Sequence, residues 1–378
     1  MRLLHTADWH LGRSLHGASL LDDQRHLLEQ FVRLAKDVRP DVVLVAGDVF
    51  DRSVPPADAV ELLDETLCRL VLELRLPTVL IAGNHDSPIR LAFGARLLEQ
   101  SRLAVAGEAR PRAVFTLDDE HGPVAICAVP YAEPANVRLV LECEAADHAA
   151  ALTAQIAALG ERTTERAVLV AHVFVAGGGE CESERPLSMG GAGCVPVGAF
   201  DGYEYVALGH LHRQQSFAGG RVRYAGSPLP YSFAEAEHGA KSVSLVEMGR
   251  DGAVTVETVA LDPRRGVRRV QGRLDALLKA PRSEDYLCVV LEDTEALLDP
   301  FSRLREVYPH LLHVERPFYA PGVARNGGSN GPHPAERGVP ELFADFFGQV
   351  TGAPMSDPER AALAELVELW QRQEREAA

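Results

Sequence analysis

Hydrophobic positions in the first hundred residues follow two periods. Short apolar runs that end on polar side chains alternate with longer segments in which apolar residues recur every three or four positions. The short runs predict buried strands at 2–8, 41–48 and 77–84, and the longer segments predict amphipathic helices at 22–38 and 57–74. This βαβαβ order is typical of a parallel sheet covered by helices.

Short apolar runs continue along the chain and predict further strands at 124–129, 167–171, 205–208, 222–225 and 242–247. We therefore expect an α/β domain over residues 1–262, built as a sandwich of β-sheets flanked by helices. From residue 263 an arginine-dense segment is followed by strand, helix and strand patterns. This change predicts a smaller α+β domain over residues 263–319.

The last sixty residues differ in composition and in apolar periodicity. Residues 320–340 lack an apolar period and are rich in Gly, Pro and Asn, as a flexible linker is. Residues 341–378 predict two helical segments around a Gly-Pro break, with Asp357 and Pro358 as the start signal of the second. Their apolar faces predict either a partner-binding segment or a small local core.

Composition narrows the class of protein. A chain of 378 residues is expected to hold more than one domain. Its six cysteines have no CxxC spacing, which argues against a disulfide framework or a thiolate zinc site. No apolar run reaches the roughly 18 residues of a membrane span, so we expect a cytoplasmic protein with no membrane partner. The formal net charge of -16 excludes binding to nucleic acid by bulk charge alone.

Side chains that can bind metals follow the predicted strands. In open α/β sheets, ligands bind at the carboxyl ends of the strands. Taken singly, each of these side chains is typical of an ordinary turn or cap, but together they recur at strand ends in one order. The candidate ligands are Asp8, His10, Asp48, Asn84, His172, His210 and His212. Imidazoles and hard oxygens without thiolates suit manganese or iron better than magnesium or structural zinc.

In order, the motifs "DWH", "GD", "GNHD", "AH" and "GHLH" resemble those of the calcineurin-like metallophosphoesterases. Within this superfamily, the segments "LHTADWHLGRSLHG", "GDVFDRSVPP" and "GSPLPYSFAEAEHGAKSVSLVEM" are similar to the SbcD family of bacterial nuclease subunits, as is the cap-like segment 264–318. The resemblance covers nearly the whole chain and implies two Mn²⁺ ions per chain. One ion would be held by Asp8, His10, Asp48 and His212, and the other by Asp48, Asn84, His172 and His210.

The resemblance also implies catalytic roles for two residues that are not ligands. His85 matches the residue that stabilises charge and protonates the leaving 3′-oxygen, and an imidazole with a pKa of about 6.5 can do so near neutrality. Its alternative role is a hydrogen bond to the backbone. Asp51 either orients His85 or is a solvated loop acid.

Two further features imply macromolecular partners. The arginines that open the second domain would contact DNA phosphates in the family's cap, or else form a solvated face; they are Arg264, Arg265, Arg268, Arg269 and Arg273. By resemblance, residues 341–378 would bind the SMC-like ATPase subunit SbcC. The resemblance further implies a homodimer, formed through the helices after Asp51 and after His85, within a heterotetramer of two nuclease and two ATPase subunits.

The sequence therefore predicts a Mn²⁺-dependent DNA nuclease subunit of an SbcCD-type complex, associated with the nucleoid and acting in DNA repair, recombination and replication. The implied activities are ATP-dependent double-strand exonuclease and endonuclease action on single strands and hairpins. One alternative is a phosphatase or cyclic-nucleotide phosphodiesterase acting on a small substrate. The other is a non-catalytic DNA-binding scaffold. The arginine-rich second domain and the apolar tail favour a macromolecular substrate and partner.

Overall fold

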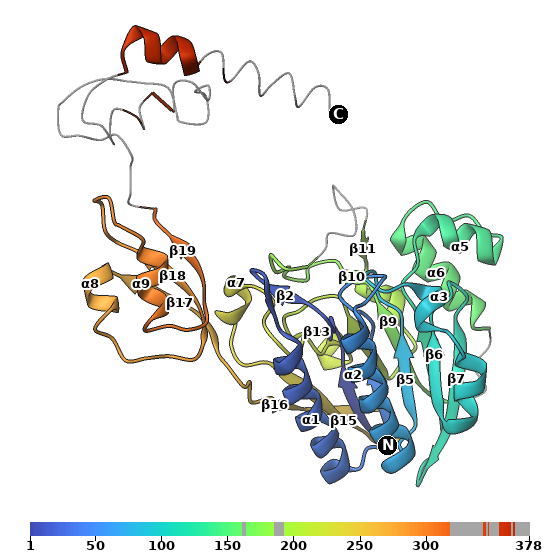
Figure 1. Cartoon of the computed structure of the whole chain (residues 1–378). Helices are drawn as coiled ribbons and strands as arrows, with labels where there is room; N and C mark the ends of the chain where they lie inside the picture. Colours follow the sequence, from blue (N-terminus) through green and yellow to red (C-terminus); the bar gives the residue numbers. More distant parts are fainter. Residues whose placement is uncertain are drawn as a thin grey trace. The chain divides into compact units, whose positions relative to one another are not determined.

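The computed structural model describes residues 1–160, 164–184 and 193–317, together with 343, 344, 347, 355–363 and 366 (Figure 1). One compact unit contains Met1–Leu291 and Asp299–Glu315, and the other contains Glu292–Leu298 and Arg316–Ala378. The predicted linker at 320–340 lies outside the described residues, and so does most of the predicted partner-binding segment. No helix among the described residues is both long and apolar enough to cross a membrane.

Two six-stranded sheets form the main part of the first unit (Figure 1). The first contains, in spatial order, β16 (Val254–Ala260), β15 (Ser242–Met248), β1 (Arg2–Thr6), β4 (Val42–Val45), β5 (Thr78–Ile81) and β6 (Leu103–Ala106). The second contains β13 (Gln215–Phe217), β14 (Val222–Tyr224), β12 (Tyr205–Gly209), β9 (Arg166–His172), β8 (Gly122–Val129) and β7 (Arg112–Asp119).

The central strands of both sheets are buried on both faces. In β1, Leu3 packs into the core between the two sheets, while its neighbour Leu4 packs into the core on the helix side. Val168 of β9 faces the inter-sheet core from the second sheet, and Leu169 faces the opposite core. Two buried faces require continuous apolar runs rather than alternation, which is why these strands were visible in the sequence. The expected sandwich of sheets flanked by helices is confirmed.

Helices cover the outer faces. On the first sheet lie α1 (Leu21–Val38) and α2 (Ala57–Cys68), the latter continued by a π-helical turn at Arg69–Glu73. Beside the second sheet lie α5 (Pro134–Leu141) and α6 (His148–Ala158), and Leu152 of α6 packs into that sheet's outer core. The short helices α3 (Pro88–Leu91) and α4 (Ala95–Leu98) follow β5. The predicted helices at 22–38 and 57–74 are thus confirmed with small changes at their ends.

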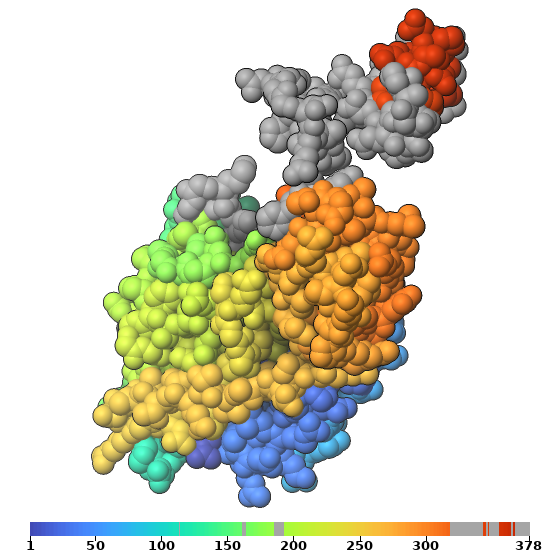
Figure 2. Space-filling view, turned by 90° about the vertical axis from the view of Figure 1, so that its left-hand side faces the viewer, coloured from blue at the N-terminus to red at the C-terminus, as the bar shows by residue number. Residues whose placement is uncertain are grey.

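The segment after residue 263 forms a lobe of its own, drawn in orange in Figure 2. Its parallel sheet contains β17 (Val267–Gly272), β18 (Tyr286–Leu291) and β19 (Leu311–Glu315), with α8 (Leu274–Leu277) and α9 (Pro300–Arg305) between them. The sequence predicted the last strand, helix and strand but not β17, which the arginine-dense segment forms. The Tyr286 hydroxyl donates to Asp23 of α1 at 2.7 Å, which joins the lobe to the sandwich.

Candidate metal centre

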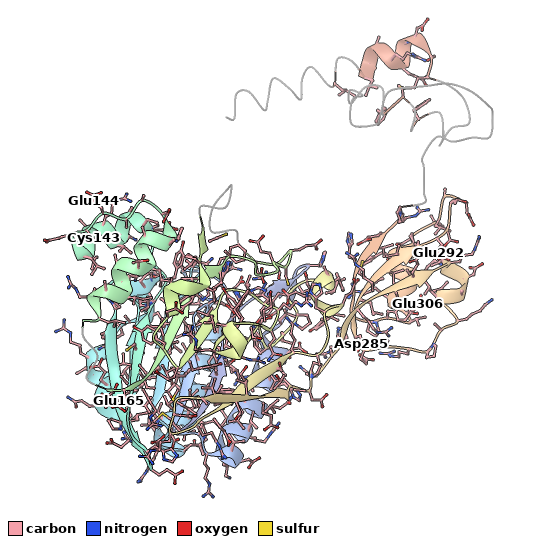
Figure 3. The ribbon with its side chains drawn as sticks, turned by 180° about the vertical axis from the view of Figure 1, so that it is seen from behind. Cys143, Glu144, Glu165, Asp285, Glu292 and Glu306 are labelled. Carbon is pink, nitrogen blue, oxygen red and sulfur yellow. The ribbon has the colours of Figure 1, made fainter. Side chains whose placement is uncertain are left out.

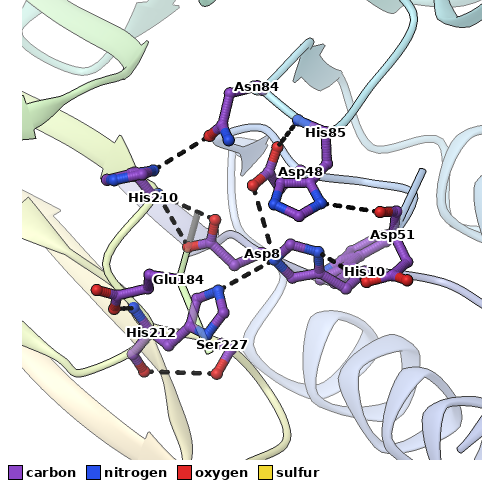
Figure 4. Close-up of polar contacts among 12 residues, drawn as sticks. Asp8, His10, Asp48, Asp51, Asn84, His85, Glu184, His210, His212 and Ser227 are labelled. Atoms are coloured by element: carbon purple, nitrogen blue, oxygen red, sulfur yellow. Dashed lines mark hydrogen bonds and ion pairs between the residues drawn. The ribbon is translucent and has the colours of Figure 1, made fainter. Parts of the chain in front are cut away.

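The seven predicted ligands lie together where strands of both sheets end. The predicted strands of the first sheet end two or three residues earlier than expected, so the polar residues lie in the loops that follow β1, β4 and β5. His172 is the last residue of β9, and the other two histidines follow β12. The structure thus brings together Asp8, His10, Asp48, Asn84, His172, His210 and His212. Figure 4 labels all of them except His172.

Four of these residues adopt a backbone conformation that side chains rarely take. The φ angles are 54° for Asp8, 44° for His10, 47° for Asp48 and 112° for His210. Such strain persists only where surrounding contacts hold the backbone in place. Here the N–H of Asp8 donates to the carbonyl of Gly47 at 3.0 Å, and the N–H of His10 donates to that of Asp48 at 2.9 Å. Main-chain bonds between the loops after β1 and β4 therefore fix the positions of three candidate ligands.

Two motif glycines are required because backbones approach closely at the site. A Cβ atom on Gly83, in the GNHD motif, would overlap Oδ1 of Asp48. A Cβ atom on Gly209, in the GHLH motif, would overlap the carbonyl oxygen of Ala46. Both approaches are far inside van der Waals contact, so any side chain at these positions would separate the strand ends that carry the ligands.

His172 and Asn84 form the first arrangement that fits a cation. The Nδ1 of His172 lies 2.9 Å from the carbonyl oxygen of Ala46, which can only accept, so Nδ1 carries the proton and Nε2 presents a lone pair. That Nε2 lies 2.9 Å from Oδ1 of Asn84, which is also an acceptor and is 3.1 Å from Nδ1 of His210. Asp48 Oδ2 lies 3.6 Å from the same Nε2. Acceptors this close repel one another, and a divalent cation among them would remove the repulsion.

His10 and His212 form the second arrangement. The Nδ1 of His212 donates to the carboxylate of Glu235 at 2.8 Å, so its Nε2 presents a lone pair to Nε2 of His10, 3.0 Å away. Nε2 of His10 lies 3.6 Å from Oδ2 of Asp48. Nδ1 of His10 is buried and has no hydrogen-bond partner among the described residues. Ligand atoms of Asp8, His10 and His212 lie within 4.8 Å of one another, so this group also fits a cation.

The electrostatics of the pocket favour bound cations. Burial, together with the neighbouring Asp48, raises the pKa of Asp8 well above its usual value. Bound positive charge would restore the ionised carboxylate. Burial also lowers the pKa of each imidazole in the set, which keeps these side chains neutral and able to bind metal. The four are His10, His172, His210 and His212.

His85 lies beside the ligands and is half-buried. Its backbone N–H donates to Oδ1 of Asp48 at 2.8 Å, and its Nδ1 donates to the backbone carbonyl of Asp51 at 2.8 Å. The carboxylate of Asp51 instead accepts from Arg13 at 3.1 Å and lies 3.6 Å from Nδ1 of His10. The contact between Asp51 and the His85 ring is therefore made by the main-chain carbonyl of Asp51. The Asp51 carboxylate contacts Arg13, so it is not simply a solvated loop acid.

Glu235 is a buried partner that the sequence reasoning missed. One carboxylate oxygen accepts from His212, and the other accepts from Nζ of Lys241 at 2.8 Å and from the N–H of Tyr231 at 3.1 Å. Although burial alone would raise the pKa of Glu235, its bonds to His212 and Lys241 hold that pKa well below its usual range. Glu235 and Lys241 both lie in the segment "GSPLPYSFAEAEHGAKS". The similarity of this segment to the SbcD family was the only sign in the sequence that they belong to the site.

Asp86 is a second missed residue. Its carboxylate accepts from the N–H groups of Val49 at 3.0 Å, Phe50 at 2.9 Å and Gly83 at 2.9 Å. It therefore joins the loop that carries Asp48 to the loop that carries Asn84. Burial and the nearby Asp48 raise the pKa of Asp86 to about 7. The position of Asp86 directly after "GNH" in the motif was the sign in the sequence that it belongs to the site.

Four of the arginines expected to bind DNA face carboxylates. Arg264 pairs with Asp22 at 3.1 Å, and Arg265 pairs with Asp23 at 3.5 Å. On β17, the outward side chains pair within the lobe, Arg268 with Asp285 at 2.7 Å and Arg269 with Glu315 at 3.5 Å; Figure 3 labels Asp285. Each pair weakens the positive field that would attract phosphates. Contact between these arginines and DNA stays a prediction.

Known families and solved structures were compared with this chain. Residues 1–214 match the calcineurin-like phosphoesterase family, and residues 263–351 match the SbcD_C family, described as the type 5 capsule protein repressor C-terminal domain. TT1561 of Thermus thermophilus is similar at 16% identity and TM-score 0.39, over 68% of this chain and 98% of that one. A dimetal phosphatase from Danio rerio, LOC 393393, is similar at 13% identity and TM-score 0.36, over 69% and 99%. At these scores neither structure bears on the activity.

The first match spans all seven candidate ligands and more than half of the chain. It supports the general part of the expected activity, a metal-dependent phosphoesterase. The second match covers the lobe at β17–β19 and indicates an SbcCD-type complex. The chain therefore belongs to the calcineurin-like phosphoesterase family, and its second matched domain makes it an SbcD-type member.

Proposed function

We propose that this chain is a Mn²⁺-dependent DNA nuclease subunit that hydrolyses phosphodiester bonds within an SbcCD-type complex. The observation that carries the proposal is the convergence of ligand atoms at the site. Nε2 of His172 meets Oδ1 of Asn84 at 2.9 Å, and Nε2 of His212 meets Nε2 of His10 at 3.0 Å. Asp48 lies 3.6 Å from both arrangements, as a bridging carboxylate would.

The ligands would divide between two ions. Asp8, His10, Asp48 and His212 would hold one, and Asp48, Asn84, His172 and His210 would hold the other. Two such ions supply Lewis acidity that activates water and neutralises phosphoryl oxygens. Nitrogen-rich sets with hard oxygens and no thiolate favour Mn²⁺ over Mg²⁺ or structural Zn²⁺.

His85 is the proposed proton donor to the leaving oxygen. Its Nδ1 proton is engaged by the carbonyl of Asp51, which fixes the plane of the ring. In the doubly protonated ring, Nε2–H would face the substrate and give its proton to the leaving oxygen. Its backbone N–H holds Asp48, so the ring and the bridging carboxylate are positioned by one residue. Ligand atoms of His10, Asp51 and His85 lie within 4.8 Å of one another, which supports a position of the imidazole beside an ion held by His10.

A polymeric substrate is supported by what surrounds the site. A small-substrate phosphoesterase needs no second domain, whereas this chain carries a matched SbcD_C domain after the sandwich. The arginines on and before β17 would exchange their carboxylate partners for DNA phosphates. Residues 341–378 would bind the ATPase SbcC, and ATP would control access of double-stranded DNA to the site.

A homodimer is proposed through α2 and the helices that follow β5. Phe93 and Leu97, four residues apart, are 86% and 74% exposed, although residues of this type are usually buried. Phe93 lies in the turn between α3 and α4, and Leu97 lies on α4. Exposed apolar side chains close together on one segment indicate a surface that another protein covers.

The decisive experiment is a cleavage assay with linear duplex, hairpin and single-stranded DNA, in Mn²⁺, Mg²⁺ or EDTA, with and without the ATPase subunit. We expect Mn²⁺-dependent cleavage of single strands and hairpins by the chain, and duplex degradation that also needs the ATPase and ATP. Hydrolysis of phosphomonoesters or cyclic nucleotides with no DNA cleavage would instead support the small-substrate alternative. Metal-independent DNA binding without any hydrolysis would support a scaffold.

A further inference from the structure

A groove of about 860 Å³ opens directly beside the candidate metal centre. The candidate ligand Asn84 lines it, together with Gly83. Its other walls come from the start of α3, at Pro88 and Ile89, and from the segment between β8 and α5, at Tyr131. Figure 1 shows α3 and α5 at the same end of the sandwich. The volume is within the range of about 300–1,000 Å³ that is typical of sites for small organic groups.

Tyr131 is held in a fixed position within this groove. Its backbone N–H donates to the carbonyl of Ala82 at 2.9 Å, and its hydroxyl donates to Glu133 at 2.6 Å. Its ring stacks on the imidazole of His148, with 5.7 Å between ring centroids and 25° between the planes. Contacts to the main chain, the hydroxyl and the ring together remove most of the side chain's freedom before any ligand binds.

The ring of Tyr131 is also close to the metal centre. Its centroid lies 6.3 Å from that of the candidate ligand His172, in an edge-to-face arrangement. None of the proposed steps of hydrolysis uses Tyr131 or the groove. A group in the groove would therefore lie within reach of a phosphodiester held at the metal centre.

We propose that the groove binds a nucleobase of the strand whose phosphodiester lies at the metal centre, and that Tyr131 stacks on this base. The proposal rests on the proposed nuclease function and specifies how its substrate is held. A base fits better than a phosphate because the carboxylates of Glu108 and Glu133 line the groove and would repel an anion. The ring of Tyr131 and the apolar walls at Pro88 and Ile89 suit a flat aromatic group. Stacking accepts every base, so this site would impose no sequence preference.

The test compares two single-stranded oligonucleotides of equal length, one with normal bases and one with abasic sites around the cleaved bond. Wild-type chain should cleave the normal strand with a KM roughly tenfold lower than that for the abasic strand, the effect of one stacked base. Tyr131→Ala should remove this preference by raising the KM for the normal strand to that for the abasic strand. Mn²⁺ affinity measured by calorimetry shows whether the metal centre of the variant is intact. Tyr131→Phe, which keeps the ring, should keep the preference.

The control variant is Leu139→Ala, on α5, whose side chain is 78% exposed and does not line the groove. It should keep the wild-type preference. A second readout is the fluorescence of 2-aminopurine next to the cleaved bond, which should be quenched on binding by wild type and Tyr131→Phe only. If Tyr131→Ala does not fold, Tyr131→Leu replaces it, because leucine fills space without stacking.

An unchanged preference in a folded, non-aromatic variant would overturn the Tyr131 assignment and leave the nuclease function standing. Wild-type chain that cleaved both strands equally would overturn the base site in the same way. Wild-type chain that cleaved neither strand would overturn the nuclease function together with the base site. The two failures are therefore distinguishable in one set of assays.

Discussion

His212 and Glu235 form a buried hydrogen bond of 2.8 Å between the imidazole Nδ1 and a carboxylate oxygen. The bond fixes the tautomer of His212 and aims its Nε2 at His10. Lys241 holds the other oxygen of the same carboxylate, so the orientation of one candidate ligand depends on residues 23 and 29 positions away in the sequence. Carboxylates that fix a metal-binding histidine in this way contribute to metal affinity although they do not touch the ion.

Substitution of Glu235 should therefore weaken metal binding. We expect Glu235→Ala to lower Mn²⁺ affinity about 10- to 100-fold, because His212 loses its orienting partner. Isothermal titration calorimetry measures this without depending on catalysis. Glu237→Ala, two residues further along and exposed, is the matched control and should bind Mn²⁺ like wild type. Equal affinities for all three proteins would show that Glu235 does not position the ligand.

Substitution of His85 should separate catalysis from metal binding. His85→Ala keeps the backbone N–H that donates to Asp48, so Mn²⁺ affinity should be unchanged. Loss of the proton donor should lower kcat for DNA cleavage about 10²- to 10⁴-fold. Single-turnover cleavage gives the rate, and calorimetry gives the affinity. Unchanged cleavage by the metal-loaded variant would remove His85 from the mechanism.

Metal removal should lower the stability of the sandwich. Binding to the folded state alone stabilises by about 2.7 kcal/mol when free Mn²⁺ is 100 times Kd, and EDTA abolishes this term. Thermal unfolding of wild type should thus shift upward with Mn²⁺. Asp48→Asn, which removes the shared carboxylate, should unfold at the same temperature with Mn²⁺ and with EDTA. A wild-type protein that was insensitive to Mn²⁺ would argue against the paired sites.

The ion pair between Asp119 and Arg166 should make stability depend on acid pH. Two bonds from Arg166, at 2.6 and 2.9 Å, hold the pKa of Asp119 well below its usual range. A lowered folded pKa contributes stability that is fully present above the unfolded pKa of about 3.9 and is lost as the pH falls towards the folded pKa. Asp119→Asn should therefore cost roughly 3 kcal/mol at pH 7 and less at pH 3.

Urea unfolding at the two pH values measures this difference. The neighbouring Asp118 is exposed, so Asp118→Asn serves as the control and should follow wild type at both pH values. A cost for Asp119→Asn that was equal at pH 7 and pH 3 would mean that the ionised pair does not supply the stability.

The exposed apolar face at Phe93 and Leu97 should control self-association. A glutamate in a buried apolar contact costs several kcal/mol, so Phe93→Glu should convert a dimer to a monomer. Light scattering coupled to size-exclusion chromatography gives the mass. Leu139→Glu places the same charge on an equally exposed leucine of α5 and should leave the dimer intact. A dimer that survived Phe93→Glu would place its interface elsewhere.

The sequence revealed the central strands better than the edges. Strands β4 and β5 are buried on both faces and are almost entirely apolar in sequence. Strand β16 lies at a sheet edge, and its alternating, mostly exposed residues carry little signal. Strand β17 was hidden by its arginines, and helix α6 by alanines that blur its apolar face.

The candidate ligands could be named from the sequence because each lies at or just after a strand end, where a parallel sheet brings chain segments together. The residues that contact and orient these ligands could not be named from the sequence. Glu235 reaches His212 through the path of the chain between β14 and β15, and Tyr131 enters its groove because α5 folds beside α3. Neither residue type nor spacing encodes such long-range proximity.

The left-handed backbone at Asp8, His10 and Asp48 has a practical consequence. The peptide bonds of these loops hold one another, and one side-chain oxygen of Asp8 accepts from the N–H of His210, a bond that an asparagine oxygen can also accept. Asparagine tolerates the same φ values. Single exchanges such as Asp8→Asn should therefore yield inert copies with a native pocket, which are suited to capturing an uncleaved substrate for crystallography.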